Sequence, residues 1–338
     1  MATTIKQVAE RAKVSAATVS YVLNGTGTVT GATKQRVLEA VAALNYQPSF
    51  AARSLRGRSH TLGLALPALP GRLADPVLAE VLAALSDTAA LRGYQLLLAT
   101  PDGERSGADL CLSLARTGRV DGLVLLDMQV DDERAVALCA IDFPHVCAGP
   151  APAGCASASV VIDGVAAAVL GVQHLLALGH RRVGLIQLPS DLAESEPRYD
   201  GYVMALAEVG IAPDPELVVE AGRREEDGYQ AMQELLSMPE PPSAVLACSD
   251  ELALGAMHAL YDAGLTVGQD VSLVGFDDTT LAAHTHPPLT ALRQPRQRLG
   301  EQIAELLIAA IEHRSDAPKH VTLQARLVVR RSTGAMTG

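Results

Sequence analysis

Short apolar runs alternate with amphipathic helical patterns between residues 61 and 275, and this rhythm restricts the fold more than any other feature of the chain. Strands are predicted at 61–66, 95–99, 122–126 and 145–148, and again at 159–162, 183–187, 217–220, 244–248 and 271–275. Helices are predicted between them at 77–92, 109–117, 133–140, 165–178, 199–209, 228–236 and 252–263. Because such apolar strands need helices on both faces of a parallel sheet, we expect two doubly wound α/β units.

The composition is that of a soluble globular protein. Of its residues, 49% are hydrophobic and 19% are charged. Its length of 338 residues is enough for two or three domains. No apolar run is long enough to cross a bilayer, and the N-terminus lacks the basic-then-apolar pattern of a secretion signal. We therefore expect a cytoplasmic protein with no membrane partner. The small and polar residues 332–338 are expected to form a flexible tail.

The first 48 residues follow another pattern, that of three short helices. Thr4 and Gln7 form a predicted capping box, so a helix begins directly after Thr4. Ser15 can cap a second helix after a three-residue turn, which is the spacing of a helix-turn-helix. A third amphipathic segment ends at Tyr46 and can cover the other two. Residues 1–48 are therefore expected to form a small all-α domain.

Charge is divided unevenly along the chain. Residues 1–60 contain Glu10 and Glu39 against eight basic residues, which are Lys6, Arg11, Lys13, Lys34, Arg36, Arg53, Arg56 and Arg58. This segment therefore carries +6, and because the whole chain carries −11, the remainder must carry −17. A basic head on an acidic body is typical of a module that binds DNA phosphates. The short helices alone would also fit an ordinary helical bundle.

The sequence predicts no catalytic or metal centre. It has no Walker phosphate loop, no G-x-S-x-G elbow and no H-E-x-x-H pair. His180 stands beside two arginines without the partners that acid–base catalysis needs. The five cysteines form no C-x-x-C pair, which argues against a zinc site or a disulfide framework; they are Cys111, Cys139, Cys147, Cys155 and Cys248. We therefore expect no enzyme activity and no cofactor.

Four N-terminal segments resemble the headpiece of the lactose-repressor (LacI/GalR) family of bacterial transcription regulators; they are 4–9, 14–20, 22–24 and 46–55. The resemblance implies that the second helix enters the major groove with Ala16, Ala17 and Tyr21 facing base edges. Tyr21 departs from the family, which usually has an arginine here; an arginine fork reads guanine bidentately, and a tyrosine cannot. Thr18 and Ser20 either contact phosphate or pack within the domain. The implied DNA-contacting residues are Thr4, Ser15, Ala16, Ala17, Thr18, Ser20, Tyr21 and Asn24.

Residues 49–60 resemble the family's hinge helix and linker. The resemblance implies that this helix pairs with that of a second subunit and inserts Leu55 into the minor groove, where an apolar wedge unstacks a base step and kinks the duplex. Ala52 is small enough for close helix approach, and Arg53 and Arg56 are placed to contact phosphates. The alternative is that Leu55 is an ordinary linker residue. Such a short helix should be marginal without DNA.

The body of the chain resembles the same family in blocks at 161–163, 174–182, 198–202, 249–255 and 274–290. The resemblance implies the two-lobed fold of periplasmic binding proteins, with the chain crossing between lobes near residues 160, 288 and 319. The first lobe is then 61–159 with 289–318, and the second lobe is 160–288 with 319–331.

The resemblance implies that an effector binds between the lobes at Asp75, Arg198, Arg223, Ser249 and Asp277. Sugar-binding relatives commonly place aromatic residues in this cleft, but this chain has only 3% aromatic residues and no Trp. We therefore expect a small polar effector, anionic or rich in hydroxyl groups, held between Arg198 and Asp277. The alternative is that Arg198 forms a structural ion pair with an aspartate and that Arg223 is solvated. Asp277 and Asp278 should point different ways, because they are adjacent at a strand end.

These features together predict a ligand-responsive transcriptional regulator, and a repressor because most relatives repress. Its expected partners are double-stranded operator DNA, a small-molecule effector, and a second copy of the chain in a homodimer or a dimer of dimers. Two alternatives come from other classes. A solute-binding module of the same two-lobed fold would be exported and would lack the basic headpiece, and a cytosolic α/β enzyme would need a catalytic motif.

The hinge assignment makes a direct prediction. Leu55→Ala should lose specific binding to a pseudo-palindromic operator, because only the wedge that kinks the central base step is removed. Effector binding and the fold should be unchanged. A gel-shift titration at fixed salt against operator and random DNA measures the loss, and equal operator affinity for both proteins would reject the hinge assignment.

Overall fold

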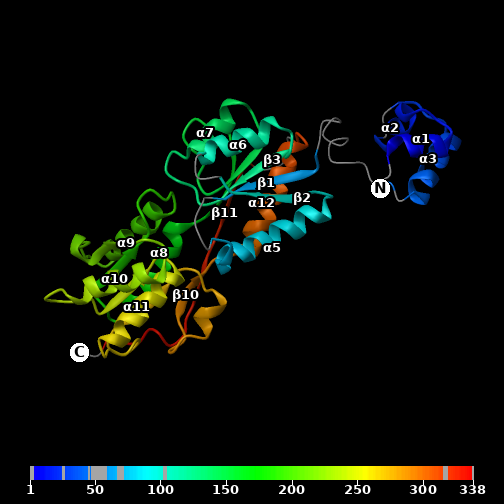
Figure 1. The fold of residues 1–338 in the computed structure, drawn as a ribbon. Coiled ribbons are helices and arrows are strands. Elements are labelled where there is room, and N and C mark those ends of the chain that lie inside the picture. The colour runs from blue at the N-terminus through cyan, green and yellow to red at the C-terminus, as the bar shows by residue number, and fades with distance from the viewer. Residues whose placement is uncertain are drawn as a thin grey trace. The chain divides into compact units, whose positions relative to one another are not determined.

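The chain divides into two compact units, residues 1–59 and residues 60–338. The computed structural model describes residues 4–24, 27–44, 46, 59–66, 72–101, 105–314 and 319–336. Among these described residues, the first unit has three helices, and the second has two six-stranded sheets with their covering helices (Figure 1). The predicted hinge residues Ala52, Arg53, Leu55 and Arg56 lie outside the described residues.

The first unit is the predicted three-helix domain. Its helices are α1 (Ile5–Ala12), α2 (Ala16–Asn24) and α3 (Gly31–Ala43). The capping box is confirmed, since the backbone N–H of Gln7 donates to Thr4 Oγ1 over 3.4 Å and the N–H of Thr4 donates to Gln7 Oε1 over 2.8 Å. Ser15 caps α2 by accepting the N–H of Thr18 at 3.0 Å. The buried core joins all three helices and consists of Val8, Ala9, Ala12, Val19, Val22, Val37, Ala40 and Tyr46.

The first lobe of the second unit contains a parallel sheet of strand order β11-β5-β4-β3-β1-β2. Its strands are β1 (Thr61–Ala65), β2 (Gln95–Ala99), β3 (Gly122–Leu125), β4 (His145–Ala148), β5 (Ala158–Ile162) and β11 (His320–Leu323). Its helices are α5 (Pro76–Leu91), α6 (Gly107–Arg116), α7 (Glu133–Ala140) and α12 (Arg296–Ile311), with a short turn η1 (Arg72–Ala74). α5 and α12 pack against each other and cover one face, while α6 and α7 cover the other (Figure 1). Gly300 permits the close approach of α12, because a Cβ there would collide with the backbone of Val81.

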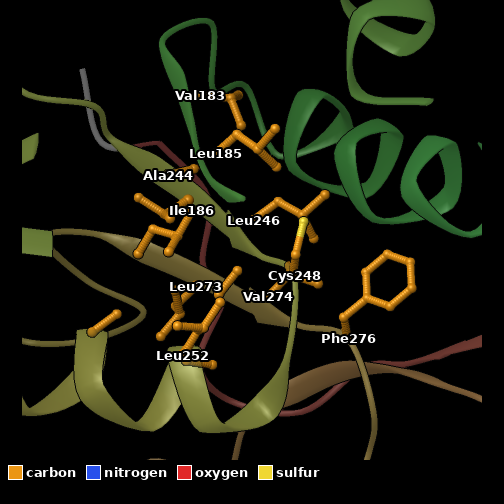
Figure 2. Close-up of a cluster of buried hydrophobic side chains, with 14 of the residues drawn as sticks. Val183, Leu185, Ile186, Ala244, Leu246, Cys248, Leu252, Leu273, Val274 and Phe276 are labelled. Carbon is orange, nitrogen blue, oxygen red and sulfur yellow. The ribbon is translucent and has the colours of Figure 1, made fainter. Parts of the chain in front are cut away.

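The second lobe contains a sheet of order β12-β10-β9-β8-β6-β7, in which only β12 is antiparallel to its neighbour. Its strands are β6 (Val183–Gln187), β7 (Val218–Glu220), β8 (Ala244–Ala247), β9 (Ser272–Gly275), β10 (Thr290–Arg293) and β12 (Arg326–Val328). Its helices are α8 (Gly164–Ala177), α9 (Ser195–Glu208), α10 (Glu225–Leu236) and α11 (Asp250–Asp262), with the turns η2 (Pro215–Leu217) and η3 (Thr280–Ala283). Figure 2 shows its apolar core, where Leu185 and Leu246 lie on one face of the sheet and Leu273 lies on the other face, beside Leu252 of α11. This burial on both sheet faces explains the continuous apolar runs.

The predicted strands and helices between residues 61 and 275 are all present, with ends that shift by a few residues. The sequence missed β10, α12, β11 and β12, which lie beyond residue 275. Two of these strands are only three or four residues long and partly exposed, so their apolar pattern is weak. Within the described residues, no helix is both long and apolar enough to cross a membrane.

The chain crosses between the lobes three times, as expected, but each crossing lies a few residues later than predicted. β5 belongs wholly to the first sheet, so the first crossing follows Ile162 rather than residue 160. β10 pairs with β9 in the second sheet, so residues 289–293 belong to the second lobe and the chain crosses at Gln294. β11 pairs with β5, which delays the third crossing to Gln324. Each strand remains in its sheet until its backbone hydrogen bonds are complete.

The predicted flexible tail is wrong for residues 332–336. Ser332 is fully buried, donating to the carbonyl of Leu273 at 2.6 Å and accepting the N–H of Thr290 at 2.8 Å. The carbonyl of Gly334 lies 3.1 Å from His180 Nε2, and the N–H of Met336 donates to the carbonyl of Leu178. The small polar residues therefore satisfy buried backbone groups of the second lobe. The ring of His180 also contacts Ser243 and Ser272, so this residue connects the segment after α8 to β9 and to the tail.

The contacts of the tail predict that Ser332→Ala destabilises the folded protein. The substitution removes the hydrogen-bond partner of two buried backbone groups, so the free energy of unfolding should fall by about 1–3 kcal/mol. Urea denaturation measures the change. Ser86→Ala, on the exposed face of α5, is the matched control and should change stability by less than about 0.5 kcal/mol. A Ser332→Ala protein as stable as the wild type would show that the tail does not hold the lobe.

Candidate functional site

The surface of α2 carries the predicted base-reading residues. Ala17 and Tyr21 are exposed and lie one helical turn apart, while Val19 and Val22 on the opposite face are buried. Half of the Tyr21 side chain is accessible, at 51%. The helix therefore presents a largely uncharged outer face to any ligand, with methyl and phenol groups where a guanidinium would read guanine.

The hydroxyl groups near the start of α2 have partners within the domain. Ser15 Oγ and Thr18 Oγ1 are 2.9 Å apart, and Ser15 also caps the helix. Of the other predicted contacts, Thr4 caps α1, Ala16 and Ser20 are partly exposed, and Asn24 is the last residue of α2. Thr18 therefore has the local role that the sequence left open, and its exposed neighbours remain predicted DNA contacts.

A chain of ion pairs joins the two lobes of the core. Arg72 holds Asp127 with two hydrogen bonds, from Nε at 2.8 Å and from Nη2 at 2.7 Å, and it also pairs with Asp75. Arg223, which follows β7 in the second lobe, donates from Nη2 to the same Asp127 over 3.1 Å. Burial would raise the pKa of Asp127, but the charges of Arg223 and Arg72 outweigh it and hold the pKa below its usual range. The carboxylate thus remains charged between two arginines.

Arg198 occupies a second, more buried position. Its side chain comes from α9 and is only 5% exposed. Nη2 donates to Glu194 Oε2 over 2.6 Å, Nη1 donates to the carbonyl of Cys248, and the guanidinium lies 4.2 Å from the centre of the Phe276 ring. The ion pair that the sequence left open as an alternative therefore exists, but its partner is a glutamate one helical turn away rather than an aspartate.

Asp277 and Asp278 point different ways, as predicted. Asp277 Oδ2 accepts the N–H of Asp250 at 3.0 Å, while Asp250 Oδ1 accepts the N–H of Asp277 at 3.1 Å. Asp278 instead pairs with Arg293 and Arg330. Burial, followed by the charge of Asp250, raises the pKa of Asp277 to about 7. The carboxyl of Asp277 therefore binds a proton more readily than an aspartate in water does.

Two predicted effector residues also begin helices. Asp75 caps α5 by accepting the N–H of Val77 at 2.8 Å, and Ser249 caps α11 by accepting the N–H of Leu252 at 3.1 Å. Both helices follow strands of a parallel sheet, where ligands bind at the carboxyl ends. The pKa of Glu251 is raised, first by burial and then by the charge of Asp75, which places this second-lobe glutamate near the first lobe.

The predicted effector residues fall into two neighbouring groups. Asp75 and Arg223 share the ion-pair chain, and Arg198 and Asp277 interact electrostatically beside Ser249. The sequence missed three charged side chains of the cleft, which are Arg72, Asp127 and Glu251. The position of Asp127 directly after an apolar strand was a usable signal, because that is the sheet edge where ligands bind. Nothing in the sequence around Arg72 indicates its partner 55 residues later.

The site holds no evident metal centre. Among residues 4–336 that the structure describes, no group of three or more His, Cys, Asp or Glu side chains is arranged to hold a metal ion. Two α/β lobes joined by ion pairs, together with a separate helix-turn-helix domain, are the architecture of ligand-responsive DNA-binding proteins.

The comparisons with known proteins agree with this class. The family model described as "Bacterial regulatory proteins, lacI family" matches residues 4–49, and that described as "Periplasmic binding protein-like domain" matches residues 172–333. The HTH-type transcriptional regulator AglR of Rhizobium meliloti (strain 1021) is 36% identical, covering 99% of this chain and 95% of AglR. The HTH-type transcriptional repressor CytR of Escherichia coli (strain K12) is 33% identical, covering 99% and 97%.

A solved structure extends the match over the whole fold. The Lac repressor dimer bound to operator and the anti-inducer ONPF superposes with a TM-score of 0.85 at 29% identity, covering 99% of this chain and all of that chain. The chain belongs to the lacI family of bacterial regulatory proteins. It is therefore a DNA-binding transcriptional regulator, and a solute-binding module without a regulatory role is not favoured.

The raised pKa of Asp277 predicts a pH dependence of stability. Between about pH 4 and pH 7 the folded protein keeps a proton on this carboxyl that the unfolded chain has released. Its contribution to the free energy of unfolding therefore falls as pH rises through this window. In urea denaturation from pH 4.5 to pH 8, Asp277→Asn should show a smaller fall of the free energy of unfolding with pH. The hydrogen bonds that the variant loses would lower its stability equally at every pH and would not change this slope. Asp87→Asn, at an exposed site on α5, should keep the wild-type slope.

Proposed function

We propose that the protein is a repressor that binds a pseudo-palindromic operator as a homodimer and releases or tightens its hold when a small molecule binds between the core lobes. Each headpiece offers α2 to one half-site, with Ala16, Ala17 and Tyr21 towards the base edges. Leu55 from each subunit wedges the centre of the site. The Lac repressor structure, solved as a dimer on operator, supports the assembly.

The observation that carries the ligand-responsive part of the proposal is the shared carboxylate of Asp127. Arg72 comes from its own lobe and Arg223 from the other, so lobe closure is tied to a pair of charges in the cleft. A ligand that changes this pairing binds the closed and open arrangements with different affinities. The effector can then change the free energy of DNA binding by no more than the difference between its own binding free energies for the two arrangements.

The effector class follows from the side chains that surround the cleft. Several arginines and acidic residues meet here, whereas aromatic residues make up only 3% of the chain and Phe276 already stacks on Arg198. We propose a small polar effector, anionic or rich in hydroxyl groups, that contacts Arg198, Asp277 and Ser249 on one lobe and Asp75 on the other. Arg223 would close over it. Planar guanidinium groups suit carboxylate, phosphate and paired hydroxyls.

A gel shift tests the regulatory proposal. The full-length protein should bind DNA upstream of its own gene in preference to random DNA, with an affinity that falls steeply as salt rises, because the basic segment 1–60, which carries +6, displaces counterions from the DNA phosphates. A thermal-shift screen of sugars, nucleobases and organic acids identifies the effector, since a ligand of the folded state raises the melting temperature. Absence of any preferred DNA would contradict the proposal.

Arg198→Ala tests the effector site. The variant should lose the effector's influence on DNA binding while basal operator affinity persists, because the guanidinium that holds the ligand is removed and the headpiece is untouched. Arg182→Ala is the matched control in the same lobe, since Arg182 pairs with Asp214 near the surface. The control should respond like the wild type. A normal response from Arg198→Ala would remove this residue from the site without affecting the DNA-binding assignment.

A further inference from the structure

Two cysteines, a serine and a histidine meet in the first lobe at the amino-terminal edge of its sheet, whereas the effector cleft lies at the carboxyl ends of the strands. Cys139 lies in the last turn of α7, and His145 is the first residue of β4. Cys155 and Ser157 lie in the segment that leads into β5. Cys139 and Cys155 are partly exposed, whereas the other three cysteines are buried.

The hydrogen bonds of His145 assign its protons. Nδ1 lies 2.7 Å from the carbonyl oxygen of Phe143, and because a carbonyl only accepts, Nδ1 must carry the hydrogen. Burial lowers the pKa of His145, so the ring is neutral and its Nε2 is an acceptor. Ser157 Oγ lies 2.6 Å from Nε2 and therefore donates its hydrogen to the ring.

Ser157 connects the histidine to a thiol. Its Oγ lies 3.3 Å from Cys139 Sγ, and since its own hydrogen is committed to His145, it accepts from the thiol. The result is a proton path from the thiol of Cys139 through the hydroxyl of Ser157 to Nε2 of His145, which accepts the proton. Cys139 Sγ is also 3.8 Å from that nitrogen. A thiol that can release its proton becomes a nucleophile.

The second thiol lies beside the first. Cys155 Sγ is 3.8 Å from the carbonyl of Ala135, which is one helical turn before Cys139 on α7. The pKa of Cys155 is raised, first by burial and then by interaction with the thiol of Cys139. Cys155 is therefore held as a neutral thiol next to the residue that the proton path activates.

We propose that Cys139 and Cys155 form an oxidisable dithiol that reacts with hydrogen peroxide and closes a reversible disulfide. The sulfur of Cys139 attacks one peroxide oxygen, the O–O bond breaks, and the leaving hydroxide takes the thiol proton from His145 and departs as water. Cys139 is now a sulfenic acid. The sulfur of Cys155 then displaces the hydroxyl group, forming the S–S bond and a second water. Two thiols are oxidised and one peroxide is reduced to two waters.

The test uses the reduced full-length protein treated with a small excess of hydrogen peroxide. Thiol counting should fall from five free thiols to three, and peptide mapping should find the bond between Cys139 and Cys155. Dithiothreitol should restore all five. Loss of other thiols first, or a rate no faster than that of the urea-unfolded chain, would overturn the proposal.

Variants separate the roles of the two cysteines. Cys155→Ser should stop the reaction at the sulfenic acid, which dimedone labels on Cys139. Cys139→Ser should leave Cys155 reduced on the same time scale. Dimedone labelling on Cys155 instead would reject the assignment of Cys139 as the attacking sulfur.

The proton path has its own test. Ser157→Ala should slow the loss of thiols by roughly tenfold or more, because the hydroxyl that passes the proton from Cys139 to His145 is removed while both cysteines remain. Ser159→Ala is the matched control, since this buried serine two residues later bonds His320 instead, and it should react at the wild-type rate. Ser157→Thr keeps the hydroxyl and should recover the rate. Melting temperatures establish that each variant is folded. If folded Ser157→Ala lost its thiols as fast as the wild type, the proton path through Ser157 would be refuted.

Discussion

The carboxylate of Asp127 is shared by two arginines from different lobes, and the arrangement of the cleft depends on this contact. Burying an unpaired carboxylate is unfavourable. Arg72 of the same lobe offsets this free-energy cost by donating two hydrogen bonds to Asp127. Arg223 adds a second positive charge only when the lobes are close enough for its Nη2 to reach Asp127. These are the charged groups that the proposed polar effector would rearrange.

The parallel sheets explain why the charges gather there. All strands of the first lobe point the same way, so Asp127 after β3 emerges at the same edge as the segment after β1 that contains Arg72. The second sheet places Ser249, Asp250 and Asp277 after β8 and β9 by the same rule. Helix caps and carboxylates thus occur together at the strand ends. The headpiece, which has its own core, supplies the separate DNA-binding surface.

Much of this organisation could be predicted because it is local. The capping box at Thr4, the cap at Ser15, and the strands and helices up to Gly275 depend on contacts within a few residues or on one apolar period. The later strands could not be predicted in the same way. β11 and β12 are short and partly exposed, and they exist because β5 and β10 offer free edges. The tail was misjudged for the same reason, since the backbone groups of Leu273 and Thr290 that bind Ser332 belong to distant segments.

The sequence by itself determined the all-α headpiece, the basic head and acidic body, and the two doubly wound units, because periodicity, caps and charge are properties of neighbouring residues. The list of candidate polar residues came from the family resemblance. Only the tertiary structure decided which of those residues meet. Arg223 contacts a carboxylate 96 positions away, and Arg198 pairs within its own helix instead of with an aspartate. Cysteines without any motif spacing come together through α7 and the approach to β5. Such pairings depend on chain crossings and strand order, which residue spacing does not encode.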